Sequence, residues 1–228
     1  MQSTAQCFKS AKKKVTKWES YFQVYDQWLH KYVGKPISFL EIGVCDGGSL
    51  EMWKDYFGNK SKVIGIDIDP NAQNLFTNNE RGITVEIGDQ SDLVFLSYLI
   101  HKHGVPDVVI DDGSHRRRDI WSSATFFLPR MRPGSLYIVE DLHGTFWDPS
   151  EAPATGDNTF TDFLQLVNSI NSPGSRGALK HVDEWGCVYS ISFYWSMVII
   201  QIESRVKQYS CICNDGTGNL SLVTAIPS

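Results

Sequence analysis

The feature that most constrains the fold of this chain is the stretch SFLEIGVCDGGS at residues 38–49. Its mostly apolar first half, glycine-rich turn and helix-like continuation are typical of a buried strand that leads into a helix in an α/β domain. A second apolar stretch, residues 63–67, ends in Asp67. A glycine turn lets a ligand approach the backbone closely, and an acid at the tip of the next strand can accept both hydroxyls of a ribose. Together the two stretches predict a site for an adenosine-containing cofactor.

The glycine turn differs from the Gly-x-Gly-x-x-Gly turn of dinucleotide-binding folds, because Cys45 stands where the middle glycine would be. The carboxylate of Glu41 would repel a pyrophosphate but suits an ammonium or sulfonium group, which favours S-adenosylmethionine over NAD. We expect Asp67 to bind the ribose, Asp89 the adenine amino group, and the helix N-terminus the cofactor's carboxylate. The predicted cofactor-binding residues are Glu41, Gly43, Gly47, Gly48, Ser49, Asp67, Asp89 and Asp111.

Strand-like and helix-like stretches alternate between residues 39 and 138. This alternation predicts an α/β fold with a doubly wound, mostly parallel, Rossmann-like sheet and right-handed crossovers. Two β-rich stretches, residues 188–194 and 197–202, predict an antiparallel hairpin at the sheet edge and bring the expected sheet to seven strands. Ligands of such sheets bind at the carboxyl ends of the strands, which is where the predicted cofactor-binding acids lie.

Helical periodicity predicts further elements around this sheet. Ser91 is expected to cap one of the helices, and the long loop at residues 144–159 is typical of a lid or substrate loop. The predicted helices span residues 49–57, 71–76, 92–103, 119–131 and 160–170.

The chain divides into three predicted parts: residues 1–36, 37–203 and 204–228. The first is a helical extension, in which residues 1–14 are frayed and residues 15–32 form an amphipathic helix rich in aromatic side chains. This helix either packs on the sheet edge or acts as a lid whose tyrosines contact the cofactor. The second part is the main domain, and the third is a tail without a clear pattern.

Composition argues against several classes of protein. The 228 residues are enough for one domain with a full core, and the net charge of -5 argues against a general nucleic-acid binder. There is no apolar run long enough to span a membrane, and the N-terminus lacks the apolar core of a signal peptide. Five cysteines, an odd number without framework spacing, indicate reduced thiols and a cytoplasmic location.

Three acids follow two neighbouring strands of the predicted sheet. Asp112 follows residues 107–110, and Glu140 and Asp141 follow residues 135–139. Three carboxylates at one edge repel one another unless some are protonated or a cation lies between them. All-oxygen ligation suits Mg²⁺, Mn²⁺ or Ca²⁺. The alternative is that some of these acids cap a helix or pair with the arginines at residues 116–118.

His115 stands three residues after Asp112 and is a candidate general base. An alcohol has a pKa of about 16 and a free imidazole about 6.5, a gap of roughly 13 kcal/mol, so histidine alone cannot form an alkoxide. A bound metal lowers the pKa of a hydroxyl as it does that of water, and so a base beside a metal is a coherent pair. The alternative is a structural histidine in a turn, and His143 is a weaker second candidate.

The chain resembles the class I S-adenosylmethionine-dependent methyltransferases that modify macrolide sugars, and the related cephalosporin-hydroxylase-like proteins. The runs LEIGV, GGSL, GIDI, IDDGSH and VEDLH carry this resemblance, and the last two are the most specific. It implies that Asp112, Glu140 and Asp141 bind Mg²⁺, that His115 and Asp112 are catalytic, and that the partner is a small hydroxylated acceptor such as a sugar or glycoside. We expect the chain to lack the large N-terminal auxiliary domain of some macrolide enzymes, and Trp195 stands where the family resemblance would place an acid. Whether the chain forms a homo-oligomer is left open.

Two alternatives remain at this point. An NAD(P)-dependent oxidoreductase would need a tyrosine-lysine pair beyond the fourth strand, and Tyr56 with Lys60 has the spacing but lies on the wrong helix. A catalytically inactive S-adenosylmethionine-binding protein would keep the same acids and His115 as structure. Loss of turnover with retained cofactor binding in His115→Ala would separate the enzyme from the inactive protein.

Overall fold

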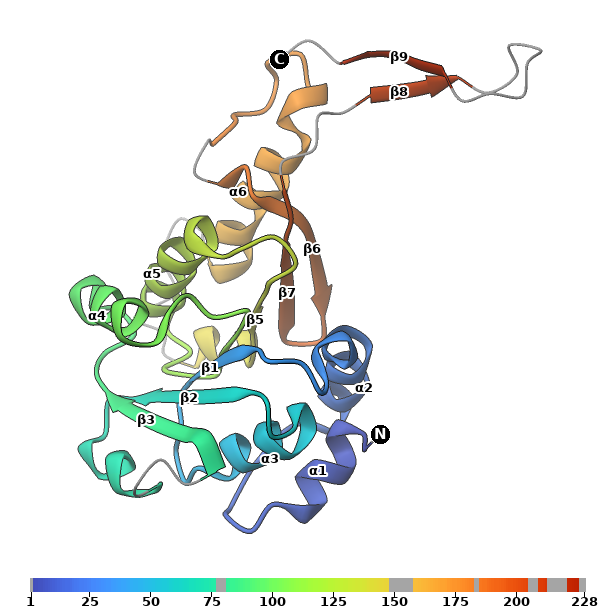
Figure 1. Ribbon diagram of the computed structural model, residues 1–228. Coiled ribbons are helices and arrows are strands. Elements are labelled where there is room, and N and C mark those ends of the chain that lie inside the picture. The colour runs from blue at the N-terminus through green and yellow to red at the C-terminus, as the bar shows by residue number, and fades with distance from the viewer. Residues whose placement is uncertain are drawn as a thin grey trace.

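The computed structural model describes residues 2–76, 81–147, 158–182 and 185–204, together with the backbone of residues 209–212 and 221–225. Its centre is a seven-stranded sheet with helices on both faces (Figure 1). The strand order is β3-β2-β1-β4-β5-β7-β6. The strands are β1 (Ser38–Ile42), β2 (Lys62–Asp67), β3 (Ile83–Ile87), β4 (Val108–Asp111), β5 (Leu136–Val139), β6 (Val188–Tyr194) and β7 (Met197–Ile202).

The sheet confirms the fold predicted from the sequence. Strands β1 to β5 are parallel to one another, and β7 runs antiparallel to both β5 and β6. The hairpin of β6 and β7 has the bounds expected from the sequence. In the register of β4 and β5, Asp111 faces Val139. The acids that follow these two strands therefore leave the sheet side by side.

Each face of the sheet has its own hydrophobic core. Helices α1, α2 and α3 pack on one face, and α4, α5 and α6 pack on the other. Neighbouring strand residues such as Phe39 and Leu40 point to opposite cores, and both are fully buried. This explains the nearly continuous apolar runs of the central strands. The helices are α1 (Thr4–Ser10), α2 (Glu19–Leu29), α3 (Gly48–Phe57), α4 (Leu93–His103), α5 (Arg117–Phe127) and α6 (Thr159–Asn171).

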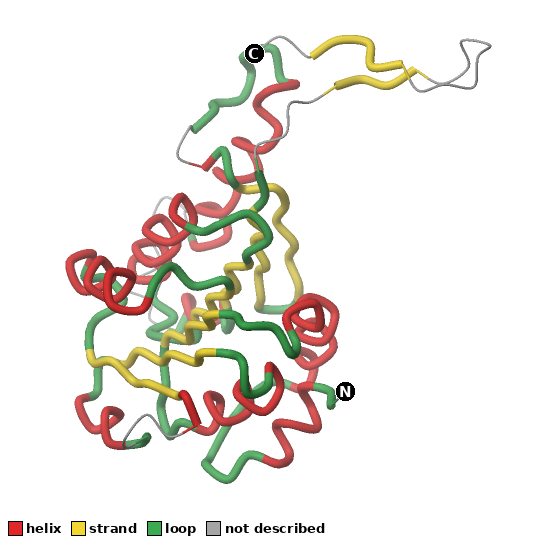
Figure 2. The backbone as a smooth tube through the Cα atoms, viewed as in Figure 1, coloured by secondary structure: helices red, strands yellow, loops and turns green. Residues whose placement is uncertain are grey.

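The prediction of a frayed start is wrong, because residues 1–14 contain α1. The helix has a capping box between Ser3 and Gln6, and its Phe8 ring lies 5.0 Å from Phe22 of α2. Seven residues are too few to show helical periodicity, and a helix this short is stabilised mainly by tertiary packing. The prediction of a helix from residue 15 is also wrong. Residues 11–18 form a non-helical segment between α1 and α2, which we call the strap (Figure 2).

Smaller differences concern helix ends. The stretch predicted as a helix at residues 71–76 is a 3₁₀ turn, Pro70–Asn74. Asp92, not Ser91, caps α4, because its side chain accepts hydrogen bonds from the backbone N–H groups of Val94 and Phe95. Helix α5 ends at Phe127, and a 3₁₀ turn at Leu128–Arg130 follows.

The loop and tail are described only in part. A 3₁₀ turn, Leu142–Phe146, overlaps the start of the loop predicted at residues 144–159. Residues 148–157 of that loop lie outside the described residues. In the tail, β8 (Tyr209–Ile212) and β9 (Ser221–Ala225) pair antiparallel in a sheet of their own, and most other tail residues are not described. Among the described residues, no helix combines the length and apolarity that crossing a bilayer requires.

Candidate active site

A cavity of about 820 Å³ opens at the carboxyl ends of β1 to β4. Four predicted cofactor-binding residues line it: Gly43, Ser49, Asp67 and Asp89. Residues 14–17 of the strap line it as well, so the N-terminal extension forms part of its wall. The cavity lies where the sequence places the cofactor.

The turn after β1 is held by close backbone packing and by Asp67. Gly43 has a φ of +88°, and a Cβ there would lie 2.1 Å from the backbone oxygen of Asp112, so only glycine fits. One carboxylate oxygen of Asp67 accepts hydrogen bonds from the backbone N–H groups of Val44 and Cys45, at 2.9 and 3.0 Å. The acid at the tip of β2 thus fixes the turn beside the cavity.

Two predicted cofactor-binding acids lie behind the cavity wall. Glu41 is fully buried and accepts hydrogen bonds from Ser49 and Trp53. Asp111 is 1% exposed and accepts hydrogen bonds from Ser123 at 2.7 Å and from Tyr137 at 3.1 Å. Burial raises the pKa of Asp111 to about 6, although these hydrogen bonds oppose the rise. Neither residue is among those that line the cavity.

The two glycines at the start of α3 are also covered. A Cβ on Gly48 would lie 2.3 Å from the backbone oxygen of Lys14, so the strap packs directly on the first turn of the helix. A Cβ on Gly47, which has a φ of +82°, would lie 2.9 Å from the ring of Phe76. These glycines permit close packing of neighbouring segments, and neither is among the residues that line the cavity.

Gln90 is a cavity residue that the sequence did not single out. Its side-chain oxygen accepts a hydrogen bond from the backbone N–H of Ser114 at 2.9 Å, and its amide nitrogen donates to Asp111 at 3.0 Å. Gln90 therefore connects the end of β3 to the loop that carries Asp112 and His115. Asp89 accepts hydrogen bonds from the backbone and hydroxyl of Ser91.

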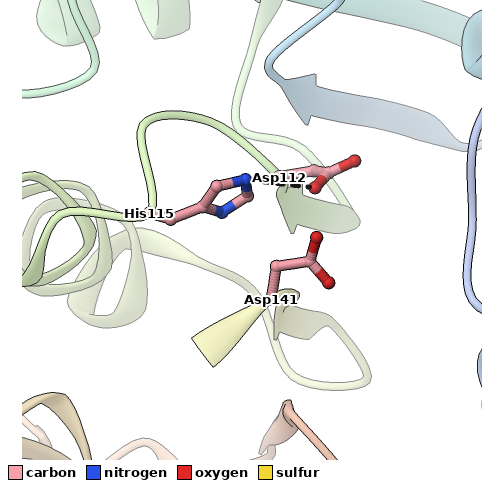
Figure 3. A group of neighbouring side chains, drawn as sticks. All are labelled: Asp112, His115 and Asp141. Carbon is pink, nitrogen blue, oxygen red and sulfur yellow. Dashed lines mark ion pairs between the residues drawn. The ribbon is translucent and has the colours of Figure 1, made fainter. Parts of the chain in front are cut away.

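The second group of candidate residues lies at the ends of β4 and β5. Ligand atoms of Asp112, His115 and Asp141 all lie within 4.8 Å of one another, and the three side chains point toward one another in Figure 3. The Nε2 atom of His115 is 4.0 Å from Oδ1 of Asp112. His115 and Asp141 have φ values of 58° and 51°, in the left-handed region that costs non-glycine residues of order 1 kcal/mol. The fold holds both side chains in place at that cost.

Glu140, predicted to bind the metal, lies deeper than the other two acids. It is 1% exposed, and its two oxygens accept hydrogen bonds from Tyr25 at 2.5 Å and from Lys17 at 2.7 Å. Burial raises the pKa of Glu140, and the neighbouring ammonium opposes the rise. The structure thus brings Asp112 and Asp141 together with His115, and it holds Glu140 beside a lysine.

Lys17, which the sequence did not single out, lies at the centre of the acid cluster. Its side chain is 2% exposed, and its ammonium lies 2.6 Å from Asp112, 2.7 Å from Glu140 and 3.5 Å from Glu41. Burial by itself lowers the pKa of Lys17, but the three carboxylates outweigh it and raise the pKa well above its usual value. The alternative predicted from the sequence was that some of these acids pair with the arginines at residues 116–118. The cation beside Asp112 and Glu140 is instead Lys17. Arg117 instead forms two hydrogen bonds with Asp162 of α6.

Aromatic residues of α2 and the strap also bond to the acids. The Tyr21 hydroxyl donates to Asp141 at 2.7 Å, and the indole N–H of Trp18 donates to the same oxygen at 3.0 Å. With Tyr25, these contacts show that the aromatic helix both packs on the sheet and reaches the acid cluster. The aromatic spacing in residues 15–32 was the available signal, whereas nothing local marked Lys17.

The donor set fits a hard divalent ion. Three acidic side chains surround the ammonium of Lys17, so the fold already holds a cation at this position. One carboxylate oxygen of Asp112 and one of Asp141 lie within 4.8 Å of each other. Carboxylate oxygens are the preferred ligands of Mg²⁺ and Mn²⁺. The dehydrogenase alternative fits less well, because Tyr56 is 4% exposed in the core below α3.

Exposed aromatic rings lie beside His115. Trp18, Trp147 and Trp195 are 47%, 65% and 57% exposed. The ring of His143 lies 5.7, 5.1 and 5.4 Å from these three indoles, and Trp147 lies 6.0 Å from His115. We call these four rings, Trp18, His143, Trp147 and Trp195, the aromatic patch. Single exposed aromatics are common, but a contiguous group beside an active site indicates a ligand surface.

The strand order and the cavity define the class: the chain has the class I S-adenosylmethionine-dependent methyltransferase fold. A methyltransferase structure supports this, MycE of the mycinamycin pathway in complex with Mg, SAH and mycinamycin VI. It superposes with a TM-score of 0.72 at 26% identity, over 88% of this chain and 52% of that one. No family model matches the chain.

The curated relatives of the chain are O-methyltransferases. Demethylmacrocin O-methyltransferase of Streptomyces fradiae is 36% identical over 153 residues, which cover 64% of this chain and 38% of that protein. Mycinamicin VI 2''-O-methyltransferase of Micromonospora griseorubida is 34% identical over 163 residues, which cover 65% and 40%. The chain thus spans less than half the length of these relatives.

Proposed function

We propose that this chain is a divalent-metal-dependent O-methyltransferase that transfers the methyl group of S-adenosylmethionine to a hydroxyl of a sugar or glycoside. One observation carries the proposal: Asp112 and His115 line the cofactor cavity and also belong to the candidate metal group with Asp141. The donor site and the groups that activate a hydroxyl therefore share one wall. The relatives named above are O-methyltransferases, which supports the same reaction.

The β1–β3 part of the cavity binds the cofactor in this proposal. Asp67, oriented by backbone N–H groups, accepts hydrogen bonds from the ribose hydroxyls. Asp89 lies at the adenine end and accepts from the amino group. Gly43 carries no side chain, which lets the turn after β1 pack against the backbone of Asp112 at the edge of the cavity. These residues place the methyl donor without forming a covalent bond to it.

The β4–β5 part activates the acceptor. Asp112, Glu140 and Asp141 would hold the metal, which when bound lowers the pKa of a coordinated hydroxyl. His115 then takes the hydroxyl proton at Nε2, the ring atom that faces the acids. The strained backbone of His115 and its contact with Gly144 fix the direction of the ring.

The aromatic patch supports a glycoside as the acceptor. Flat indole faces pack well against the apolar face of a sugar ring, while the ring hydroxyls remain free to reach the acids. Trp195 belongs to this patch, although an acid was expected at its position. The names of the two relatives give demethylmacrocin and mycinamicin VI as their acceptors.

Methyl-transfer assays on His115→Ala test the proposal. With Mg²⁺ and an array of glycosides, loss of the base should lower the rate about 10²- to 10⁴-fold. Titration calorimetry should show unchanged S-adenosylhomocysteine affinity, because His115 is not among the groups proposed to bind it. His101→Ala is a matched control, since His101 is exposed on α4 away from the cavity. Full activity of His115→Ala would exclude His115 as the base, and absence of S-adenosylhomocysteine binding by the unmodified protein would exclude the methyltransferase.

A further inference from the structure

The position of Lys17 conflicts with that of a metal bound by the predicted acids. Its Nζ lies 2.6 Å from Oδ2 of Asp112 and 2.7 Å from Oε2 of Glu140. A Mg²⁺ ion bonded to both oxygens would sit about 2.0–2.1 Å from each, in the same space. Two cations this close repel strongly in a buried site, so the ammonium and the ion cannot both be bound there.

Lys17 also anchors the strap. The backbone N–H groups of Lys12 and Lys13 bond to Glu51 near the surface, whereas the Lys17 side chain is buried among acids. The strap is not helical, so the Lys17 side chain can move away from the acids without breaking a helix. Residues 14–17 line the cofactor cavity. A change at Lys17 therefore reaches the wall of that cavity directly.

We propose that Lys17 is a built-in competitor of the divalent ion, which displaces its ammonium from Asp112 and Glu140 and so releases the strap from the cofactor cavity. The inference rests on the metal site of the proposed function and adds how that site is loaded. It gives Lys17 a purpose in the metal-free protein: the ammonium neutralises buried acids that would otherwise repel one another. Metal binding and opening of the cofactor cavity are thereby linked.

A different arrangement would leave Lys17 in place. An ion held by Asp112, His115 and Asp141 would use the imidazole as a ligand and would not need Glu140. Mg²⁺ prefers oxygen to nitrogen ligands, which favours the all-carboxylate set and leaves His115 free as the base. The two arrangements differ in one measurable property, the accessibility of the Lys17 ammonium after metal binding.

Lysine labelling of the unmodified protein tests this directly. Reductive methylation followed by peptide mass spectrometry measures the reactivity of each lysine with and without saturating Mg²⁺. Lys17 should be protected without the ion and should react about tenfold faster or more with it, since opening exposes a buried amine. Lys12 is exposed and should react in both states, and Lys54, 3% exposed, should stay protected in both. Unchanged protection of Lys17 with Mg²⁺ bound would overturn the proposal.

Metal affinity gives a second test. Lys17→Met removes the competitor, so its Mg²⁺ affinity by titration calorimetry should rise about tenfold or more over the unmodified protein. Lys12→Met removes the same charge from the exposed part of the strap and should change the affinity less than about twofold. Glu140→Gln in the Lys17→Met background should abolish the gain, because Glu140 is then the ligand that was freed. Equal affinities of the two lysine variants would overturn the proposal, and the labelling test stands if Lys17→Met does not fold.

S-adenosylhomocysteine titration separates this inference from the proposed function. Binding of both S-adenosylhomocysteine and Mg²⁺ with Lys17 still protected overturns the inference alone. If the protein fails to bind S-adenosylhomocysteine, or fails to bind Mg²⁺, the proposal of a metal-dependent methyltransferase is overturned together with the inference. Binding of both with Lys17 exposed supports both.

Discussion

The two halves of the ligand-binding edge hold their carboxylates in different ways. In the β1–β3 half, Asp67 and Asp89 accept hydrogen bonds mainly from backbone groups nearby in the chain. In the β4–β5 half, Asp112, Glu140 and Asp141 bond to side chains of the strap and α2 about 100 residues earlier. The hydrogen bonds of the β1–β3 half need only the strands and turns of that half. The second half is complete only when the N-terminal extension has packed on the sheet.

Lys17→Met should break the β4–β5 half most strongly. It leaves three acids without their cation, two of them buried, and removing one partner of a buried ion pair costs about 3–5 kcal/mol of unfolding free energy. Urea denaturation at low metal concentration measures this loss. Lys12→Met should stay within about 0.5 kcal/mol of the unmodified protein. If Lys17→Met lowered the unfolding free energy by less than about 1 kcal/mol, the ion pairs of Lys17 would be as weak as surface pairs. The β4–β5 half would then not depend on the strap as the comparison states.

Tyr25→Phe should weaken the same half less. It removes the hydroxyl that donates to Glu140 at 2.5 Å in a fully buried contact, and a hydrogen bond to a charged group contributes about 1.5–3 kcal/mol. The free energy of unfolding is again the measurement. Tyr189→Phe, at a tyrosine 56% exposed on β6, is the matched control and should be neutral. Equal effects of the two variants would mean that Glu140 does not depend on α2.

Asp67→Asn should affect the β1–β3 half alone. The amide keeps one acceptor but turns N–H groups toward backbone donors, so S-adenosylhomocysteine affinity should fall about tenfold, or about 1.4 kcal/mol. Mg²⁺ affinity should not change. Asp112→Asn should lower the Mg²⁺ affinity more than the S-adenosylhomocysteine affinity, and calorimetric titration of each variant with each ligand measures both. If either variant lost both ligands equally, the two halves would not be separate sites.

Glu86→Gln should have the smallest effect, a loss of stability near neutral pH that disappears in acid. Glu86 pairs with Lys102 and His103 at the outer β3 edge, and although burial opposes them, their hydrogen bonds hold its pKa below the usual value. The folded pKa is below the unfolded one, so this stabilisation is present above about pH 4.5 and is lost as pH falls through the folded pKa. The Gln variant should lack this part of the acid-induced loss, worth less than about 1 kcal/mol. Melting temperatures of both proteins between pH 3 and 7 measure the difference, and parallel curves would contradict it.

Much of the β1–β3 half could be predicted because its signals are local. The glycine turn at Gly43, the acid at Asp67 and the helix that follows lie close together in the chain, so their spacing carries the geometry. The sequence did not indicate that Glu41 and Asp111 would be buried, since strand-end position does not say which face a side chain takes. Register decides that, and register depends on neighbouring strands.

The sequence by itself determined the parallel sheet, its antiparallel hairpin and the placement of acids at its carboxyl edge, because periodicity and short-range turn chemistry specify these features. Only the tertiary structure decided which cation those acids hold. Lys17 lies 95 residues from Asp112 and 123 from Glu140, on a segment whose own pattern predicted a helix. A buried ion pair forms where burial and opposite charge coincide in space, and that coincidence exists only once the extension has packed on the sheet.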